Sequence, residues 1–440
     1  EDELTVKKYI SFIIAFALLI CTVAVSVSSA EGNEYSPTNA NVRIIGRYSV
    51  SNDAVNVGYG LTELNFNVKA ESVTCSISTE QEAPAAPYFA VYVNGKLTKK
   101  FKVNKGEAEY TLASGLSSNK TTNIRLVKTN ERWMIAKIGK ITVAGGEIAA
   151  PSKAKGKLIE VIGDSISAAY GILATDTETE DDVTTDATYG YAKILADKMG
   201  ADVNLVAESG KGIYCNYNGE VGKTMPAIYD KNPDGTAYSH TAEPDVIIVN
   251  LGTNDVYGMG VNKEITKDNI TAAAKEFIAK LREVHQNSYI VWTYGLMNSD
   301  MTSVIEEAVS SFSEDGRISF IPLPAQSEFS DGVGKSSHPD ITANKATADY
   351  LFEKLINNGI IGSGMPGYLE TSADAAWDYD SSKMLGDANN DYNIDICDLV
   401  RMNEHSENSD IKIDDGNADY NGDGKIDSDD IALLRKQLLG

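Results

Sequence analysis

Short stretches in which apolar and polar residues alternate occupy the chain up to about residue 150. The alternation is clearest at 64–68, where the sequence is Leu-Asn-Phe-Asn-Val, and it recurs at 73–77, 88–93 and 124–127. A two-residue period puts the apolar side chains on one face of a β-strand, and clusters of turn residues separate the stretches. The pattern predicts an all-β domain, a sandwich or jelly roll, over residues 31–150.

A different pattern follows a polar, proline-bearing join at 149–156. Runs that are apolar throughout now alternate with segments of helical periodicity, and such runs are typical of strands buried on both faces. We therefore predict a three-layer α/β domain with a parallel five-stranded sheet over residues 156–361. The expected strands are 158–162, 203–207, 246–251, 289–293 and 318–322, and the expected helices lie near 189–199, 267–284, 302–313 and 341–357.

The first thirty residues have the layout of a signal peptide. Lys7 and Lys8 precede an apolar run, and the small residues at 28–30 follow it. We expect residues 1–30 to be removed after Ala30, which leaves a secreted chain that is not held in a membrane. An uncleaved anchor is the alternative, because an apolar run of about eighteen residues could also span a bilayer.

Charge narrows the classes of partner. The chain has 440 residues, of which 63 are acidic and 39 basic, so its net charge is −24. Repulsion from phosphate groups disfavours binding to nucleic acid or to an anionic membrane surface. The composition predicts a soluble, multidomain protein that handles neutral substrates or binds cations.

Two Asp-rich stretches repeat in the last part of the chain, after a predicted linker at 362–385. Residues 387–398 and 419–430 both carry oxygen-bearing residues at the spacing of an EF-hand loop, and each stretch leads into a short apolar helix, at 399–403 and 431–439. The spacing predicts two structural Ca²⁺ ions in a small α domain over residues 386–440. The expected ligands are Asp387, Asn389, Asp391, Asn393 and Asp398 in the first loop, and Asp419, Asn421, Asp423, the Lys425 carbonyl and Asp430 in the second.

Four polar blocks coincide with ends of the predicted parallel strands. Ser165, Gly210 and Asn254 follow the first three strands, and His338 stands just before the final helix. The carboxyl ends of parallel strands share one edge of a sheet, where open α/β sheets bind their ligands. This order of serine, glycine, asparagine and histidine resembles the SGNH (GDSL-like) hydrolase superfamily.

The superfamily's chemistry assigns roles to these residues. Ser165 would be the nucleophile and His338 its base, because an imidazole has an ordinary pKa near neutrality. The backbone amides of Ser165 and Gly210 and the side-chain amide of Asn254 would form the oxyanion hole. No cofactor is expected for this reaction.

One position departs from the superfamily pattern. Members usually carry an aspartate three residues before the histidine, and this chain has Lys335 there. We therefore predict a Ser165–His338 dyad in which a backbone carbonyl or another side chain holds Nδ1 of His338.

Several features together resemble carbohydrate esterase family 2 over about residues 42–360. They are a β-sandwich joined to an SGNH domain, Ser-Gly-Lys-Gly in the second block, Gly-Thr-Asn-Asp in the third, and a histidine without its usual acid. The resemblance implies removal of O-acetyl groups from plant polysaccharides such as xylan and glucomannan. Tyr214, Tyr217 and Tyr257 lie close to the blocks and are candidates for stacking against sugar rings.

Two other functions fit the same blocks. One is a general GDSL lipase or thioesterase, and the other is a carbohydrate-binding module whose catalysis is weak. Release of acetate from acetylated xylan distinguishes them from an acetyl esterase.

The paired loop-helix units resemble a type I dockerin. That resemblance implies a cohesin module of a cellulosome scaffold as partner, contacted through loop positions 10 and 11, which are Ile396, Cys397, Ser428 and Asp429. With the signal peptide, it implies an extracellular, cellulosome-associated enzyme.

Overall fold

The computed structural model describes residues 32–174 and 181–362 and, towards the carboxyl terminus, residues 386, 388, 396–407, 409, 411, 413, 415–421 and 423–439. The predicted signal peptide and almost all of the predicted linker lie outside these ranges. None of the helices within the ranges combines the length and the apolar composition that crossing a membrane requires.

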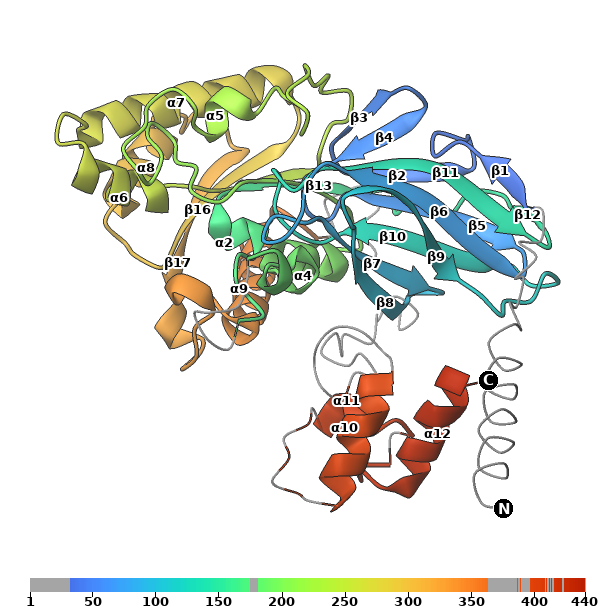
Figure 1. Ribbon diagram of the computed structural model, residues 1–440. Coiled ribbons are helices and arrows are strands. Elements are labelled where there is room, and N and C mark those ends of the chain that lie inside the picture. The colour runs from blue at the N-terminus through green and yellow to red at the C-terminus, as the bar shows by residue number, and fades with distance from the viewer. Residues whose placement is uncertain are drawn as a thin grey trace, which may run out of the picture.

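The amino-terminal part is a sandwich of two antiparallel sheets (Figure 1). One sheet has the strand order β3-β4-β11-β6-β9, with β1 paired to β11, and the other has the order β12-β5-β10-β7-β8, with β2 paired to β5. The strands are β1 (Asn33–Tyr35), β2 (Val42–Ile45), β3 (Tyr48–Ser51), β4 (Ala54–Val57), β5 (Glu63–Lys69), β6 (Ser72–Thr79), β7 (Tyr88–Val93), β8 (Lys96–Lys102), β9 (Gly106–Ala113), β10 (Thr122–Lys128), β11 (Ala136–Ala144) and β12 (Glu147–Ile148).

Alternation along the strands builds the core of the sandwich. In β5, Leu64, Phe66 and Val68 are fully buried, whereas Asn65 and Asn67 between them are partly exposed. The inward residues of both sheets form one apolar cluster. The predicted all-β domain is therefore confirmed, and the two-residue period is its cause.

The central part contains the predicted parallel sheet. Its strands have the order β14-β13-β15-β16-β17 and every pairing is parallel. They are β13 (Leu158–Gly163), β14 (Asp202–Ala207), β15 (Val246–Asn250), β16 (Tyr289–Leu296) and β17 (Ile318–Ala325). The order reverses beside β13, so the carboxyl ends of β13, β14 and β15 meet at one place, and Ser165 follows the middle strand of the three.

Helices cover both faces of this sheet, which explains why its strands are apolar throughout. Val161 of β13 packs in the cluster that includes α4 and α9, and Ile162 packs in the cluster that includes α7 and α8. The helical elements are α2 (Ser165–Ala168), α3 (Asp181–Thr184), η1 (Ala187–Tyr189), α4 (Tyr191–Lys198), α5 (Met225–Ile228), α6 (Thr253–Val261), α7 (Lys267–Val284), α8 (Thr302–Ser310), η2 (Gln326–Glu328), η3 (Lys335–Ser337) and α9 (Ile341–Asn357).

The sandwich and the α/β domain share buried contacts. Leu61 and Val127 of the sandwich belong to the same apolar cluster as β13 and α4. Arg47 is completely buried, donates to the carbonyl of Tyr229 and lies 3.6 Å from the carboxylate of Glu160 on β13. A shared core and buried polar contacts indicate that the two domains act as one unit.

A small helical domain ends the chain. Its helices are α10 (Ile396–Glu407), α11 (Asp415–Ala418) and α12 (Ser428–Leu439). Buried residues from these helices and from position 388 form its core: Ala388, Leu399, Met402, Ala418 and Leu434. The predicted helical domain is confirmed, and α11 between the two expected helices is an addition.

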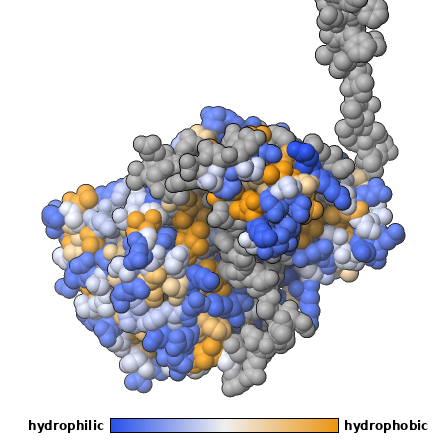
Figure 2. All heavy atoms as spheres, turned by 90° about the horizontal axis from the view of Figure 1, so that it is seen from below, coloured by the Kyte–Doolittle hydropathy of each residue, from blue (hydrophilic) through white to orange (hydrophobic). Residues whose placement is uncertain are grey.

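Polar residues cover most of the molecular face in Figure 2, with apolar side chains in small groups.

Candidate active site

Ser165 begins α2 directly after β13. The turn is shaped by Asp164, whose side chain accepts a hydrogen bond of 3.0 Å from the backbone amide of Ile166. Gly163 permits the chain to pass close to Ser167, because a Cβ on Gly163 would lie 2.0 Å from Oγ of Ser167. The result is a serine at the carboxyl end of the sheet that is 7% exposed as a residue.

His338 contacts Ser165 directly. Nε2 of His338 lies 2.7 Å from Oγ of Ser165, and Nδ1 lies 3.0 Å from the backbone carbonyl oxygen of Lys335. A carbonyl oxygen can only accept, so Nδ1 carries the hydrogen and Nε2 is the acceptor that faces the serine. Burial lowers the pKa of His338, although the hydrogen bond to the Lys335 carbonyl acts in the opposite direction. The ring is therefore neutral at neutral pH.

The loop before His338 has an unusual backbone conformation. Ser336 and Ser337 have φ values of 52° and 61°, in the left-handed region that non-glycine residues rarely adopt. Gln326 donates to the carbonyl of Ser337 at 2.8 Å, and the Lys335 amide donates to the carbonyl of Gly171 at 3.0 Å. Left-handed residues of this kind persist where the surroundings fix them. These contacts hold the Lys335 carbonyl towards the imidazole.

Asn254 lies at the start of α6 and its amide points towards the serine turn. Its Nδ2 donates to Oδ2 of Asp164 at 3.0 Å and to the carbonyl of Lys211 at 2.9 Å. Burial raises the pKa of Asp164 to about 7, and the bonds from Ile166 and Asn254 oppose the shift. The asparagine thus joins the first and second blocks. Both of its amide hydrogens have partners in this structure.

Gly210 occupies the loop after β14. Its φ of +80° favours glycine, and a Cβ there would lie 2.8 Å from the ring of the exposed Tyr217. Asp255 fixes the next part of the loop by accepting from the backbone amides of Ile213, Tyr214 and Cys215 at 2.8, 2.8 and 3.1 Å. Burial raises the pKa of the Asp255 carboxyl to about 6, while these amides oppose the shift.

The β-sandwich also holds this loop. Glu131 accepts from the hydroxyl of Ser209, and the Ser209 amide lies 3.4 Å from its other carboxylate oxygen. Arg132 forms an ion pair of 2.7 Å with Glu208. The loop that contains Gly210 is therefore attached to a different domain immediately before the glycine.

The three candidate tyrosines differ in exposure. Tyr217 and Tyr257 are 59% and 51% exposed, whereas Tyr214 is partly buried and packs against the apolar cluster beneath α6. Tyr217 and Tyr257 are therefore the two candidates with most of their surface open to solvent. Their contact with a sugar stays a prediction.

Sequence reasoning missed two residues beside the site. The ring of Tyr170 lies edge-on to His338, with 4.9 Å between the ring centroids. The signal in the sequence that could have identified Tyr170 was its position five residues after Ser165. Glu131 had no such signal, because it lies in the other domain, 78 positions before Ser209.

Apart from position 422, the second predicted calcium loop lies within the described residues, but most of the first does not. Asp430 is fully buried, and its two carboxylate oxygens accept from the amides of Asn421 and Asp427 at 3.0 and 2.9 Å. Asp419 accepts from the amides of Asp423 and Gly424 at 3.1 and 3.0 Å. The oxygen donors suit a hard cation. No cluster of three or more His, Cys, Asp or Glu side chains positioned for a metal is found in the described ranges.

The remaining predicted residues of that domain are only partly described. Asp398 is buried, whereas Asp387, Asn389, Asp391 and Asn393 lie outside the described residues. Positions 396 and 397 fall in the first turn of α10, and Ser428 and Asp429 are exposed at the start of α12.

Three family descriptions match successive parts of the chain. Residues 44–152 match the carbohydrate esterase 2 N-terminal family, residues 159–351 match GDSL-like Lipase/Acylhydrolase, and residues 385–439 match the dockerin type I domain. The three matches agree with the three parts of the fold.

Individual relatives cover parts of the chain. Cellulase/esterase CelE of Acetivibrio thermocellus is 30% identical over 316 residues, which are 67% of this chain and 36% of that protein. An acetylxylan esterase / glucomannan deacetylase of Cellvibrio japonicus is 27% identical over 294 residues, 63% of this chain and 78% of that protein. This chain therefore spans about a third of the first relative.

The fold is also found among solved structures. An acetyl xylan esterase from the rumen bacterium Butyrivibrio proteoclasticus has a TM-score of 0.68 and 22% identity, and covers 75% of this chain and 100% of its own. At this identity the likeness concerns the fold alone.

Proposed function

Because this chain carries the N-terminal and GDSL-like domains of family 2 carbohydrate esterases and a type I dockerin domain, we propose that it is an acetyl esterase of plant hemicellulose. The observation that carries the proposal is the 2.7 Å hydrogen bond between Oγ of Ser165 and Nε2 of His338. The relatives named for acetylxylan and glucomannan support the substrate class.

The reaction starts with proton transfer. Oγ of Ser165 attacks the acetyl carbonyl carbon while Nε2 of His338 accepts its proton. The resulting oxyanion is stabilised by the amides of Ser165 and Gly210 and by the Asn254 side chain. Because Asn254 already donates to Asp164 and Lys211, one of those two bonds has to give way.

Collapse of this intermediate expels the sugar. The leaving hydroxyl takes the proton from His338, and an acetyl ester of Ser165 remains. Water then attacks this ester as His338 accepts a proton from it, and acetate leaves as the serine regains its hydrogen. The Lys335 carbonyl keeps the imidazole in the tautomer that both steps require.

The exposed rings favour a polysaccharide over a lipid. Tyr217, in the loop after β14, and Tyr257, on α6, are exposed and offer stacking surfaces to sugar rings. We infer that the acetylated chain lies across them.

The carboxyl-terminal domain determines where the enzyme acts. In our proposal, two Ca²⁺ ions are held by the oxygen donors of the two loops, and the starts of α10 and α12 contact a cohesin. Residues Ile396, Cys397, Ser428 and Asp429 form this contact. The enzyme is then secreted and attached to a cellulosome.

Acetate release tests the proposed reaction. Acetylated xylan and p-nitrophenyl acetate are incubated with the wild type, Ser165→Ala, His338→Ala and, as matched control, the exposed-surface variant Ser313→Ala. We expect loss of about 10³-fold or more in kcat for the two site variants and no change for the control.

Three outcomes would overturn the proposal. Full activity in Ser165→Ala removes the serine from its role. Faster cleavage of long-chain esters than of acetate favours a lipase. Polysaccharide binding by the wild type without acetate release favours a binding module.

A further inference from the structure

Tyr170 and Gly171 follow α2 and lie between the serine turn and the loop that carries His338. The backbone amide of Tyr170 donates to the carbonyl of Ser165 at 3.0 Å. The carbonyl of Gly171 accepts from the backbone amide of Lys335, also at 3.0 Å. Two adjacent residues are therefore hydrogen-bonded to the two sides of the proposed dyad.

Gly171 allows the backbone of the histidine loop to approach closely. Its φ is +62°, and a Cβ at this position would lie 2.3 Å from Cβ of Lys335 and 3.1 Å from its Cα. The approach is also close on the facing side, because a Cβ on Gly334 would lie 2.6 Å from the carbonyl oxygen of Gly171. A side chain at position 171 would therefore displace the peptide of Lys335, whose carbonyl accepts from His338.

The side chain of Tyr170 contacts the imidazole itself. The centroids of the two rings are 4.9 Å apart and their planes are inclined by 60°, which is the geometry of a favourable aromatic pair. Both residues are partly buried. The two nitrogens of His338 are held by hydrogen bonds, and the contact with Tyr170 restricts rotation of the ring about those bonds.

The dyad needs such restraint because it has no carboxylate behind the histidine. In a triad, the carboxylate holds the imidazole in one orientation as well as in one tautomer. The Lys335 carbonyl fixes the tautomer of His338, but it orients the ring only as well as its own loop is placed. Misplacement by about 1 Å can cost roughly a hundredfold in rate. The distance from Nε2 of His338 to Oγ of Ser165 therefore depends on what holds the loop and the ring.

We propose that Tyr170 and Gly171 are positioning residues that orient His338 in place of the aspartate that superfamily members usually carry. Gly171 places the carbonyl of Lys335, and Tyr170 restricts the imidazole ring. Neither residue takes part in proton transfer, so both act through His338. This proposal rests on the esterase function proposed above.

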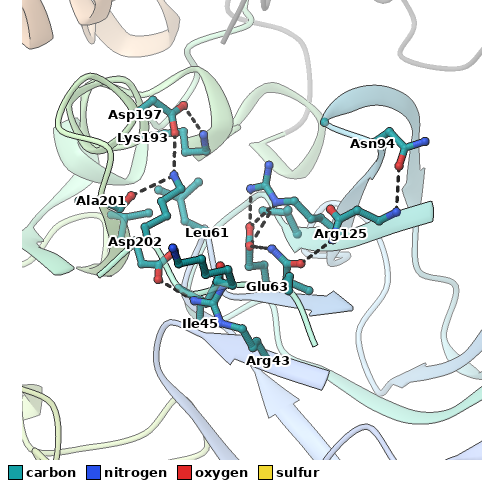
Figure 3. Close-up of a pocket in the computed structure, with 18 residues that line it drawn as sticks. Arg43, Ile45, Leu61, Glu63, Asn94, Arg125, Lys193, Asp197, Ala201 and Asp202 are labelled. Atoms are coloured by element: carbon teal, nitrogen blue, oxygen red, sulfur yellow. Dashed lines mark hydrogen bonds and ion pairs between the residues drawn. The ribbon is translucent and has the colours of Figure 1, made fainter. Parts of the chain in front are cut away.

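A pair of glycine variants tests the role of Gly171. Gly171→Ala places a methyl group against Lys335, whereas Gly200→Ala places one at a φ of +61° with no atom within 4 Å. The two changes share the backbone strain and differ in the contact. Gly200 precedes Ala201 and Asp202, which line the cavity between the sandwich and the start of β14 (Figure 3). The control therefore lies at the opposite end of the sheet from the candidate active site.

The kinetics of the two glycine variants should differ. We expect kcat for p-nitrophenyl acetate to fall about tenfold or more in Gly171→Ala relative to Gly200→Ala, with KM within about threefold of the wild type in both. Melting temperatures measured in parallel report the strain that the two variants share. Equal values of kcat in Gly171→Ala and Gly200→Ala would overturn the role of Gly171.

Variants of Tyr170 test the ring contact. Tyr170→Phe keeps the ring, so we expect kcat to stay within about threefold of the wild type, whereas Tyr170→Ala should lose about ten- to a hundredfold in kcat with little change in KM. The matched control is Tyr110→Ala, which removes a partly buried ring stacked on Phe101 in the sandwich and should leave kcat unchanged. Full kcat in Tyr170→Ala would overturn the role of the ring.

The hydrogen on Nδ1 of His338 gives a readout that a general loss of stability does not move. In NMR spectra of protein with isotope-labelled histidine, we expect a resolved Nδ1–H resonance in the wild type, because the Lys335 carbonyl accepts that hydrogen. The spectrum of His338→Ala assigns it. The resonance should broaden or vanish in Tyr170→Ala and Gly171→Ala, and it should persist in Tyr170→Phe and Gly200→Ala.

The outcomes separate this proposal from the esterase proposal. If Ser165→Ala is inactive while Tyr170→Ala and Gly171→Ala keep both full kcat and the resonance, only the positioning proposal fails. If Ser165→Ala keeps full activity, the esterase mechanism fails, and the positioning proposal fails with it.

Discussion

At the scale of single residues, the proposed dyad depends on a carbonyl in place of a carboxylate. The Lys335 carbonyl accepts from Nδ1 of His338 and so fixes the tautomer. A carbonyl dipole stabilises the imidazolium less than a full negative charge does, so rigid placement has to compensate. The left-handed residues Ser336 and Ser337 supply that placement.

A substitution at Lys335 separates backbone from side chain. Lys335→Ala keeps the carbonyl, so we expect kcat/KM for p-nitrophenyl acetate to stay within about threefold of the wild type. His338→Ala serves as the inactive reference. A loss of a hundredfold or more in Lys335→Ala would show that the lysine side chain takes part.

The pH dependence of kcat/KM should follow the ionisation of His338. Burial lowers the pKa of His338, and the base has to be neutral. Activity should therefore be complete at neutral pH and fall only below the ordinary histidine value of about 6.5. An acid limb of kcat/KM centred above that value would contradict the assignment.

At the scale of structural elements, one loop joins the site to the sandwich. Glu131 binds Ser209 immediately before Gly210, and Arg132 binds Glu208. Burial raises the pKa of Glu131 to about 7, although the bonds from Ser209 oppose the shift. Because the folded-state pKa lies above the ordinary value of 4.5, the ionisation of Glu131 reduces stability as pH rises from about 4.5 to about 7.

Variants of Glu131 test whether this attachment positions Gly210. Glu131→Ala removes it, and we expect kcat for p-nitrophenyl acetate to fall roughly ten- to a hundredfold with little change in KM, because displaced donors weaken the transition state. Glu131→Gln can still bind Ser209 and should restore most of kcat. It should also raise the melting temperature above pH 7, where it removes a buried charge.

The kcat and the melting temperature of Glu131→Ala together show whether Glu131 positions Gly210 or only stabilises the fold. If kcat of Glu131→Ala equals that of the wild type while its melting temperature falls, the contact is structural only. If the wild type itself lacks activity, the esterase proposal fails first.

At the scale of the whole molecule, the sandwich and the α/β domain share a core, whereas the dockerin domain has a small core of its own. Among the described residues of that domain, the buried apolar cluster consists of Ala388, Leu399, Met402, Ala418 and Leu434. A cluster of this size supports a fold weakly, so we expect metal binding to contribute to folding. Catalysis and attachment are therefore expected to respond differently to removal of calcium.

Chelation tests this separation. With EDTA we expect the helices of residues 386–440 to unfold, with loss of helical circular dichroism and of cohesin binding, while hydrolysis of p-nitrophenyl acetate continues. Added Ca²⁺ should restore both. Unchanged circular dichroism in the chelated protein would argue against metal-dependent folding.

The sequence by itself determined the elements and their order. The apolar runs became the five parallel strands, with ends that differ by at most three residues from those predicted, and the alternating stretches became strands of the sandwich. It also indicated that Ser165 and His338 belong to one site, because parallel strands bring their carboxyl ends together.

Only the tertiary structure decided what surrounds these residues. Every residue has a backbone carbonyl, so no sequence signal marks the one at Lys335 that meets His338. Glu131 reaches Ser209 from another domain, and the ring of Tyr170 meets that of His338, which lies on a loop far along the chain. Such contacts depend on packing between elements, which periodicity along the chain does not encode.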